Sequence, residues 1–202
     1  MSIKTVIVTL LVLFIVYLGW GWLRPKPTVL YLGDSLTKGT MVLPKYRYWK
    51  RLDSDVVQNA IDLSKNGITA SEGFTMLKAY LEANPEQLDI VVIELGANDY
   101  LQGRNLDAMK DVLREIVEFV RSKGAVPVLV GFNPRYGNLS FDLYQELSVE
   151  LSVIAVPDFL KDVWGVRELL LPDGLHPNYM GHEIMAKNVK PYLEQAVSEW
   201  KK

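Results

Sequence analysis

The sequence predicts an α/β fold in which helices cover both faces of a parallel sheet. Two observations carry this prediction: five short apolar runs rich in β-branched residues recur along residues 27–202, and segments with helical spacing separate them. Strands that are apolar on both faces need cover on both sides, which the crossover helices of a parallel sheet provide. A chain of 202 residues without an internal repeat fits one domain of this class.

The elements follow from the pattern in chain order. The predicted strands are 28–32 (TVLYL), 55–61 (DVVQNAI), 89–95 (DIVVIEL), 126–131 (VPVLVG) and 151–156 (LSVIAV). The predicted helices cover 70–83, 105–123, roughly 140–149 and 179–199. Either Asn105 or Asp107 can cap the start of the second helix, and Gly124 follows its end.

The first 26 residues form a separate predicted unit, a membrane anchor with a short linker. Residues 5–23 read TVIVTLLVLFIVYLGWGWL, nineteen residues without a charge, close to the roughly 20 that a helix needs to span a bilayer. The stretch is longer than the core of a cleavable signal peptide, and no small-x-small site follows it. We therefore expect one transmembrane helix before a globular domain at 27–202, with a cleaved signal or a buried core helix as alternatives.

Charge and composition exclude several functions. The chain has 22 basic and 24 acidic residues, and its net charge of −2 gives no overall positive field for nucleic acid. It has no cysteine, which excludes thiol catalysis, disulfides and cysteine-ligated zinc. The two histidines, His176 and His182, have no third convergent ligand in the sequence, so we expect no metal site.

Four polar turns follow the predicted strands. They are GDSL at 33–36, Gly67, GAND at 96–99 and DGLH at 173–176. Ligands of open parallel sheets bind beyond the carboxyl ends of the strands, where these turns lie. We therefore expect all four turns to share one rim of the sheet.

Three residues of these turns have the chemistry of a nucleophilic triad. Ser35 is a weak nucleophile that needs a base, and His176 is suited to that role because imidazole can accept and return a proton near neutral pH. Asp173, three residues before it, can orient the ring and stabilise the imidazolium. Attack on a carbonyl would create an oxyanion, for which the Ser35 and Gly67 amides and the Asn98 side-chain NH2 are candidate donors.

Each of these residues also has a structural interpretation. Ser35 could cap a helix, His176 could be a solvated loop residue, and Asp173 and Gly67 could be turn formers. Asn98 could cap the segment after the third strand. Three other residues lie near these turns. Asp34 and Asp99 are expected to be structural and to bond loop amides, whereas Glu94 is either a paired buried acid or a supporting group of the site.

The four blocks, in this order, resemble those of the SGNH (GDSL-type) hydrolase family. The similarity covers residues 28–195, and the stretches VVIELGANDYLQG and LLPDGLHPN look similar to bacterial thioesterase, lysophospholipase and arylesterase members. The resemblance implies a flavodoxin-like three-layer fold with strand order 2-1-3-4-5 and hydrolysis of ester or thioester bonds without a cofactor. It also implies catalytic roles for Ser35, Asp173 and His176, with Gly67 and Asn98 in the oxyanion hole.

The expected function is that of a membrane-tethered serine esterase acting on acyl esters, thioesters or lysophospholipids. The alternatives are a cell-envelope carbohydrate deacetylase with the same residues and a non-catalytic lipid- or envelope-binding module. The family's frequent envelope location suggests an extracytoplasmic domain. Two segments bear on the substrate. The cations within 38–51 either form a solvated face or attract anionic lipid, and residues 132–144 could wall an acyl or aryl pocket or pack as plain structure.

Overall fold

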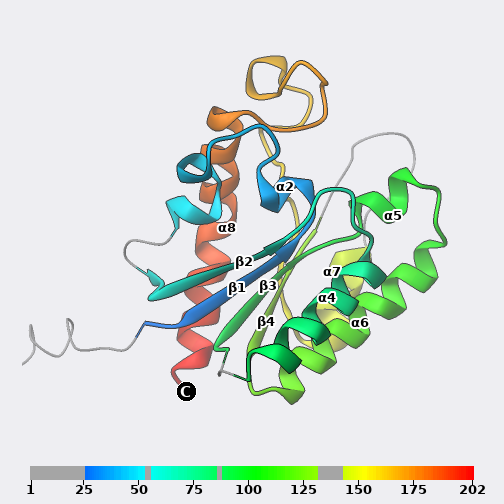
Figure 1. Ribbon diagram of the computed structural model, residues 1–202, viewed down its shortest axis with the longest axis vertical. Helices are drawn as coiled ribbons and strands as arrows, with labels where there is room; N and C mark the ends of the chain where they lie inside the picture. The colour runs from blue at the N-terminus through cyan, green and yellow to red at the C-terminus, as the bar shows by residue number, and fades with distance from the viewer. Residues whose placement is uncertain (1–25, 53–55, 86–87, 132–142) are drawn as a thin grey trace, which may run out of the picture.

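A five-stranded parallel sheet forms the centre of the computed structural model, which describes residues 26–52, 56–85, 88–131 and 143–202 (Figure 1). Its strands run in the order β2-β1-β3-β4-β5, which confirms the predicted topology. The strands are β1 (Thr28–Gly33), β2 (Asn59–Ser64), β3 (Ile90–Glu94), β4 (Val126–Val130) and β5 (Ile154–Val156).

Helices cover both faces of this sheet, as the continuous apolar character of its strands requires (Figure 1). The α-helices are α2 (Ser35–Lys38), α4 (Ala70–Ala83), α5 (Ala97–Leu101), α6 (Leu106–Ser122), α7 (Leu143–Leu151) and α8 (Tyr179–Trp200). Three short 3-10 helices complete the described elements: η1 (Pro44–Tyr46), η2 (Trp49–Arg51) and η3 (Arg167–Leu169). Helices α4, α6 and α7 lie on one face, and α8 lies on the other.

Alternate residues of each strand supply the two hydrophobic cores. In β1, Leu30 and Leu32 pack in the cluster that includes residues of α4, α6 and α7, whereas Val29 and Tyr31 pack in the cluster that includes α8. All four side chains are fully buried. A strand that is buried on both faces cannot show polar alternation, which explains why the central strands β1, β3 and β4 are largely apolar.

The predicted helices agree closely with those observed. The Asn105 side chain caps α6 by accepting hydrogen bonds from the backbone N–H groups of Asp107 and Ala108, so Asn105 and not Asp107 is the cap. A capping box between Thr69 and Glu72 begins α4. These local contacts determine where the chain turns from the strand rim into a helix.

The second strand was predicted wrongly at 55–61, because it spans Asn59–Ser64. It is an edge strand with mostly half-buried side chains, so it tolerates polar residues such as Asp62, which accepts a hydrogen bond from Arg47 at 2.8 Å. Val57 is buried although it precedes the strand, and because it is apolar the predicted strand began too early in the chain. The fifth strand is shorter than predicted, since α7 continues to Leu151.

The predicted anchor, residues 5–23, lies outside the described residues. Among the residues that the structure describes, no helix has the length and apolar character needed to span a bilayer. The described chain enters the sheet at Thr28, at the amino end of β1, and reaches Ser35 just beyond the carboxyl end of the same strand. The candidate site therefore lies at the edge of the sheet opposite to the point where the chain enters it.

Candidate active site

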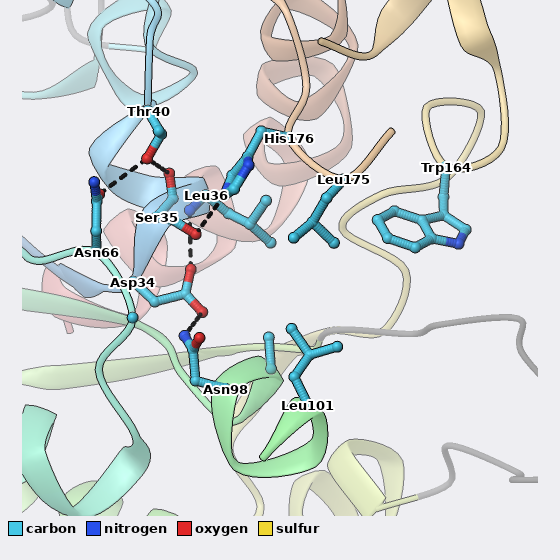
Figure 2. Close-up of a pocket in the computed structure, with 12 residues that line it drawn as sticks. Asp34, Ser35, Leu36, Thr40, Asn66, Asn98, Leu101, Trp164, Leu175 and His176 are labelled. Atoms are coloured by element: carbon cyan, nitrogen blue, oxygen red, sulfur yellow. Dashed lines mark hydrogen bonds between the residues drawn. The ribbon is translucent and has the colours of Figure 1, made fainter. Parts of the chain in front are cut away.

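Ser35 begins the single turn of α2 directly beyond the carboxyl end of β1. The Asp34 side chain fixes this turn, because its Oδ1 atom accepts a hydrogen bond from the backbone N–H of Leu36 at 2.9 Å. Gly39, with a φ of 65°, ends the turn in the left-handed region. The serine hydroxyl points toward His176, as Figure 2 shows.

The three residues predicted to form a triad lie in one line of contacts. His176 Nε2 lies 2.9 Å from Ser35 Oγ (Figure 2), and His176 Nδ1 lies 2.8 Å from Asp173 Oδ2. The other carboxylate oxygen of Asp173 accepts hydrogen bonds from the backbone N–H groups of His176 and Leu175, at 3.0 and 2.9 Å. The hydrogen bonds from the His176 backbone and ring, followed by that from Leu175, lower the pKa of Asp173 to about 2.

Backbone contacts hold the loop that carries this aspartate and histidine. Leu171 N–H donates to the His176 carbonyl at 2.7 Å, and Gly174, with a φ of 68°, closes a tight turn onto the Leu171 carbonyl. The Asn178 side chain then caps α8. A loop bonded at both ends can present Asp173 and His176 to Ser35 in a fixed orientation.

Gly67 and Asn98 line the same cavity as Ser35 and His176. Asn98 donates one N–H of its side-chain amide to Asp34 Oδ2 at 2.8 Å, and the amide has a second N–H for another acceptor. The N-cap of α5 is Gly96, so the alternative role of Asn98 as the cap is wrong. Both residues predicted for the oxyanion hole therefore stand beside the serine.

The cavity measures about 200 Å³ and is mainly apolar away from the polar group at Ser35. Figure 2 shows Ser35, His176 and Asn98 on one side and Leu101, Leu175 and Trp164 on the other. Sequence reasoning missed the cavity roles of all three apolar residues. Leu101 and Leu175 adjoin polar blocks that were identified, but Trp164 lies in the long loop before α8, where no periodic pattern predicts side-chain positions.

Two carboxyl groups are buried beneath the rim. Glu94, left open by the sequence, accepts hydrogen bonds from Thr37 Oγ1 at 2.8 Å and from the Asp34 backbone N–H at 3.3 Å. Burial raises the pKa of Asp34 to about 6, and burial together with the nearby Asp34 charge raises the pKa of Glu94 well above its usual range. Asp34 and Asp99 both accept backbone N–H groups, as structural residues should, but the donors are Leu36 in α2 and Ala70 at the start of α4 and not loop amides.

His182 is a buried core residue. Its Nδ1 atom accepts a hydrogen bond from the Tyr48 backbone N–H at 3.3 Å, and its ring stacks on that of Tyr48. Burial, with smaller contributions from the charges of Arg51 and Arg47, lowers the pKa of His182 to about 4. A neutral histidine that accepts a backbone N–H is part of the packing beneath the site.

Three of the five cations within 38–51 have carboxylate partners inside the protein. Arg47 Nη1 and Lys38 Nζ lie 2.8 and 3.5 Å from Asp62 Oδ2, and Arg51 Nη1 lies 3.6 Å from Glu183 Oε2. These contacts favour a structural role for the basic segment over recruitment of anionic lipid. Residues 132–142 of the other segment considered for substrate contact lie outside the described residues.

Comparisons with known proteins identify the family of the chain. Residues 31–184 match the model of the GDSL-like Lipase/Acylhydrolase family. The chain is 29% identical to "Thioesterase 1/protease 1/lysophospholipase L1" of Escherichia coli K12, over 82% of this chain and 85% of that protein. It is 30% identical to "Esterase TesA" of Pseudomonas aeruginosa, over 83% and 88% of the two chains.

A solved structure supports the same assignment. The psychrotrophic esterase EstA from Pseudoalteromonas sp., in a structure inhibited by monoethylphosphonate, matches with a TM-score of 0.75 and 25% identity, over 86% of this chain and 100% of that one. The chain therefore belongs to the GDSL-like lipase/acylhydrolase family and is a GDSL-type hydrolase.

Proposed function

We propose that the protein is a serine esterase that hydrolyses carboxylic ester or thioester bonds through Ser35, His176 and Asp173. The observation that carries the proposal is the unbroken line of contacts from Asp173 through His176 to the Ser35 hydroxyl, at the mouth of an apolar cavity. This line has the order of acid, base and nucleophile that acyl transfer requires.

In the first half of the reaction, Ser35 Oγ attacks the carbonyl carbon while His176 Nε2 takes the hydroxyl proton. The carbonyl oxygen becomes an oxyanion, which the amides of Ser35 and Gly67 and the second N–H of Asn98 would stabilise. The ionised Asp173 stabilises the imidazolium. Collapse of the intermediate breaks the ester or thioester bond, and the departing alcohol or thiol takes the proton from His176.

In the second half, water replaces the leaving group. His176 takes a proton from a water molecule as its oxygen attacks the acyl carbon on Ser35. A second oxyanion forms in the same place and uses the same donors. Its collapse releases the carboxylic acid and returns the proton to the Ser35 oxygen, which restores the starting state without a cofactor.

The cavity supports acyl esters with small apolar acyl groups as substrates. Leu101, Leu175 and Trp164 supply an apolar wall suited to hydrocarbon. The part of the cavity formed by described residues, about 200 Å³, is smaller than the about 300–1,000 Å³ of typical drug-sized ligand sites. Lysophospholipids and aryl esters remain within the proposed class through their ester bonds, and the relative from Vibrio mimicus is named an arylesterase.

The small cavity also favours a second candidate, an O-acetyl esterase of cell-envelope carbohydrate. An acetyl group fills little volume, and a sugar leaving group would remain outside the apolar wall. The two candidates share the same chemistry and differ in the group that enters the cavity. A panel of p-nitrophenyl esters from acetate to dodecanoate, acyl thioesters and acetylated sugars separates them by their kcat/KM values.

The proposed tether is the uncharged segment 5–23, with the enzyme domain on the extracytoplasmic side. Because the chain enters β1 at the edge opposite to Ser35, a tether at this end would leave the catalytic rim facing away from the attachment point. Fractionation of cells that express the full chain, followed by protease treatment of intact cells, tests both parts. Recovery in the soluble fraction or protection of the domain in intact cells would reject the tether or its proposed orientation, respectively.

Covalent labelling tests the core of the proposal. A fluorophosphonate probe should label Ser35, and Ser35→Ala should abolish both labelling and ester hydrolysis. Ser122→Ala is a matched control, because Ser122 is exposed at the end of α6 and its hydroxyl donates to the Phe119 carbonyl of the same helix. Folded protein that hydrolyses no ester and takes no label would instead indicate a binding module.

A further inference from the structure

Asp34 and Glu94 form a buried carboxyl pair between the sheet and the oxyanion-hole residue Asn98. Each side chain has only 1% of its surface exposed. Thr37 Oγ1 and the Asp34 backbone N–H donate to Glu94 Oε2, whereas Leu36 N–H and Asn98 Nδ2 donate to the two oxygens of Asp34. The pair therefore connects the third strand to the candidate oxyanion hole.

The charges of this pair are not balanced by cations. All the donors named above are neutral groups, and no salt bridge within the described part of the chain reaches either carboxyl. Two buried carboxylates side by side repel each other and lose hydration, so such a pair retains a proton. One proton reduces the buried charge from two to one.

The hydrogen bonds indicate which residue holds the proton. Both oxygens of Asp34 accept N–H groups, which stabilises its ionised form. Glu94 Oε1 is buried and has no hydrogen-bond partner among the described residues. A carboxylate with one oxygen fully unsatisfied is costly, whereas a neutral acid loses much less on burial.

We propose that Asp34 and Glu94 hold a single proton, located on Glu94, and that this pair positions the Asn98 side-chain amide for the oxyanion. This inference rests on the proposed esterase function for its catalytic consequence. An ionised Asp34 can only accept hydrogen bonds, so Asn98 must present its nitrogen and not its oxygen. With one N–H held by Asp34, the second has a fixed direction. Glu94 is thus a positioning residue. It keeps Asp34 in place, and by holding the proton it limits the pair to one negative charge.

Close packing makes the pair rigid. A Cβ atom on Gly33 would lie 2.9 Å from Glu94 Oε2 and would also collide with Thr37, so a glycine is required at this position. The Thr37 hydroxyl contacts the Tyr48 hydroxyl at 3.2 Å, and its carbonyl accepts a hydrogen bond from the Trp49 ring at 3.0 Å. Thr37, which donates to Glu94, is therefore held by further contacts of its own.

Other titratable groups around the pair also affect the pKa of Asp34. The nearby charge of His176 lowers the pKa of Asp34, and that of Asp99 raises it. Burial raises the pKa of Tyr48, so its hydroxyl stays neutral. These effects leave Asp34 as the member of the pair that ionises near neutral pH.

Infrared spectroscopy tests the location of the proton without any substrate. Wild-type protein at pH 8 should show the carbonyl stretch of a buried protonated carboxylic acid, and Glu94→Gln should remove it. Absence of this band from the wild type, or its persistence in Glu94→Gln, would overturn the proposal. Because the measurement uses resting enzyme, its outcome is independent of whether Ser35 acts as the nucleophile.

Isosteric variants test the positioning role. Glu94→Gln copies a neutral acid and should keep kcat within about threefold of the wild type, whereas Asp34→Asn replaces the obligate acceptor and should lower kcat at least about tenfold with little change in KM. Glu94→Ala should also lower kcat, and recovery by Gln excludes a general packing effect. If Asp34→Asn is tolerated and Glu94→Gln is not, the proton assignment is wrong. If every variant, including Ser35→Ala, still hydrolyses esters, the esterase proposal itself is rejected.

Discussion

The Nε2 atom of His176 lies 2.9 Å from the Oγ atom of Ser35, although 141 positions separate the two residues in the sequence. Separate local structures fix the two partners: the Asp34 cap holds the turn of Ser35, and the two backbone N–H groups bound by Asp173 hold the loop of His176. The sheet sets the distance between them. Because the fold maintains this contact, substitutions that preserve the fold can test single groups of the site.

Loss of the Asn98 amide should slow turnover with little effect on substrate binding. Asn98→Ala removes a donor that acts on the oxyanion, so we expect kcat to fall about 10²- to 10³-fold, or about 2.7–4 kcal/mol, with KM nearly unchanged. Steady-state kinetics with a p-nitrophenyl ester measures both constants. Asn84→Ala is the control, because the Asn84 amide donates to the Tyr80 carbonyl at the end of its own helix, away from the cavity residues. An unchanged kcat in Asn98→Ala would remove this residue from the mechanism.

Trp164 should limit the length of the acyl group. Its ring lies on the apolar side of the cavity, so Trp164→Ala should open space for additional methylene groups. We expect the ratio of kcat/KM for octanoate over acetate esters to rise about tenfold, equivalent to burial of roughly two CH2 groups at about 0.8 kcal/mol each. Val149→Ala, at an exposed position of α7, should leave the ratio unchanged. A ratio that stays constant in Trp164→Ala would place the acyl chain elsewhere.

The sequence predicted the rim of the site better than its surroundings. The carboxyl ends of parallel strands meet at one edge, so the polar turns at Ser35, Gly67 and Asn98 could be expected to converge from strand order alone. The DGLH motif at 173–176 allowed the loop of His176 to be assigned to the same rim. The predicted position of the edge strand β2 was wrong because its polar residues are stabilised by partners from other segments, such as Arg47.

Other features depend on contacts that no local pattern encodes. The role of Glu94 depends on Thr37 and on the Asp34 backbone, 57 and 60 positions away, so a single acid in an apolar strand could not be interpreted. Trp164 reaches the cavity from an irregular loop, where its position follows from tertiary packing. The membrane anchor stays a prediction, since residues 5–23 lie outside the part of the chain that the structure describes.

Protonation of His182 should destabilise the folded protein in acid. Its pKa is lowered to about 4 by burial, whereas a histidine in the unfolded chain titrates near pH 6.5. Between these values the unfolded chain binds a proton that the folded protein does not, so stability falls as the pH falls. The loss is about 1.4 kcal/mol per pH unit, or about 2 kcal/mol from pH 6.5 to 5.

The variant His182→Gln isolates this effect, because glutamine can accept the Tyr48 N–H but does not titrate. Urea unfolding at pH 7, 6 and 5 should show a steeper loss of stability in the wild type than in the variant. The raised pKa values of Asp34 and Glu94 act in the opposite direction, since these acids take up protons in the folded state, but they are present in both proteins. Parallel pH dependences in the two proteins would contradict the assignment to His182.

Gly67 should affect turnover beyond its effect on stability. Its φ of 77° lies in the left-handed region, but a Cβ atom would meet nothing within 4 Å, so Gly67→Ala introduces backbone strain without a collision. Gly124 matches it closely, with a φ of 79° and equally open space, but it follows α6 at the opposite edge of the sheet. Each substitution should cost about 1–2 kcal/mol of stability, measured by urea unfolding.

The two variants should differ in kcat. If the Gly67 amide donates to the oxyanion, relaxation of the strained turn will move this donor, and we expect kcat to fall at least about tenfold in Gly67→Ala. Gly124→Ala carries the same strain without a donor near the cavity, so its kcat should remain close to that of the wild type. Equal kcat values in the two variants would mean that Gly67 serves only as a turn residue, and that the oxyanion depends on Ser35 and Asn98 for its hydrogen bonds.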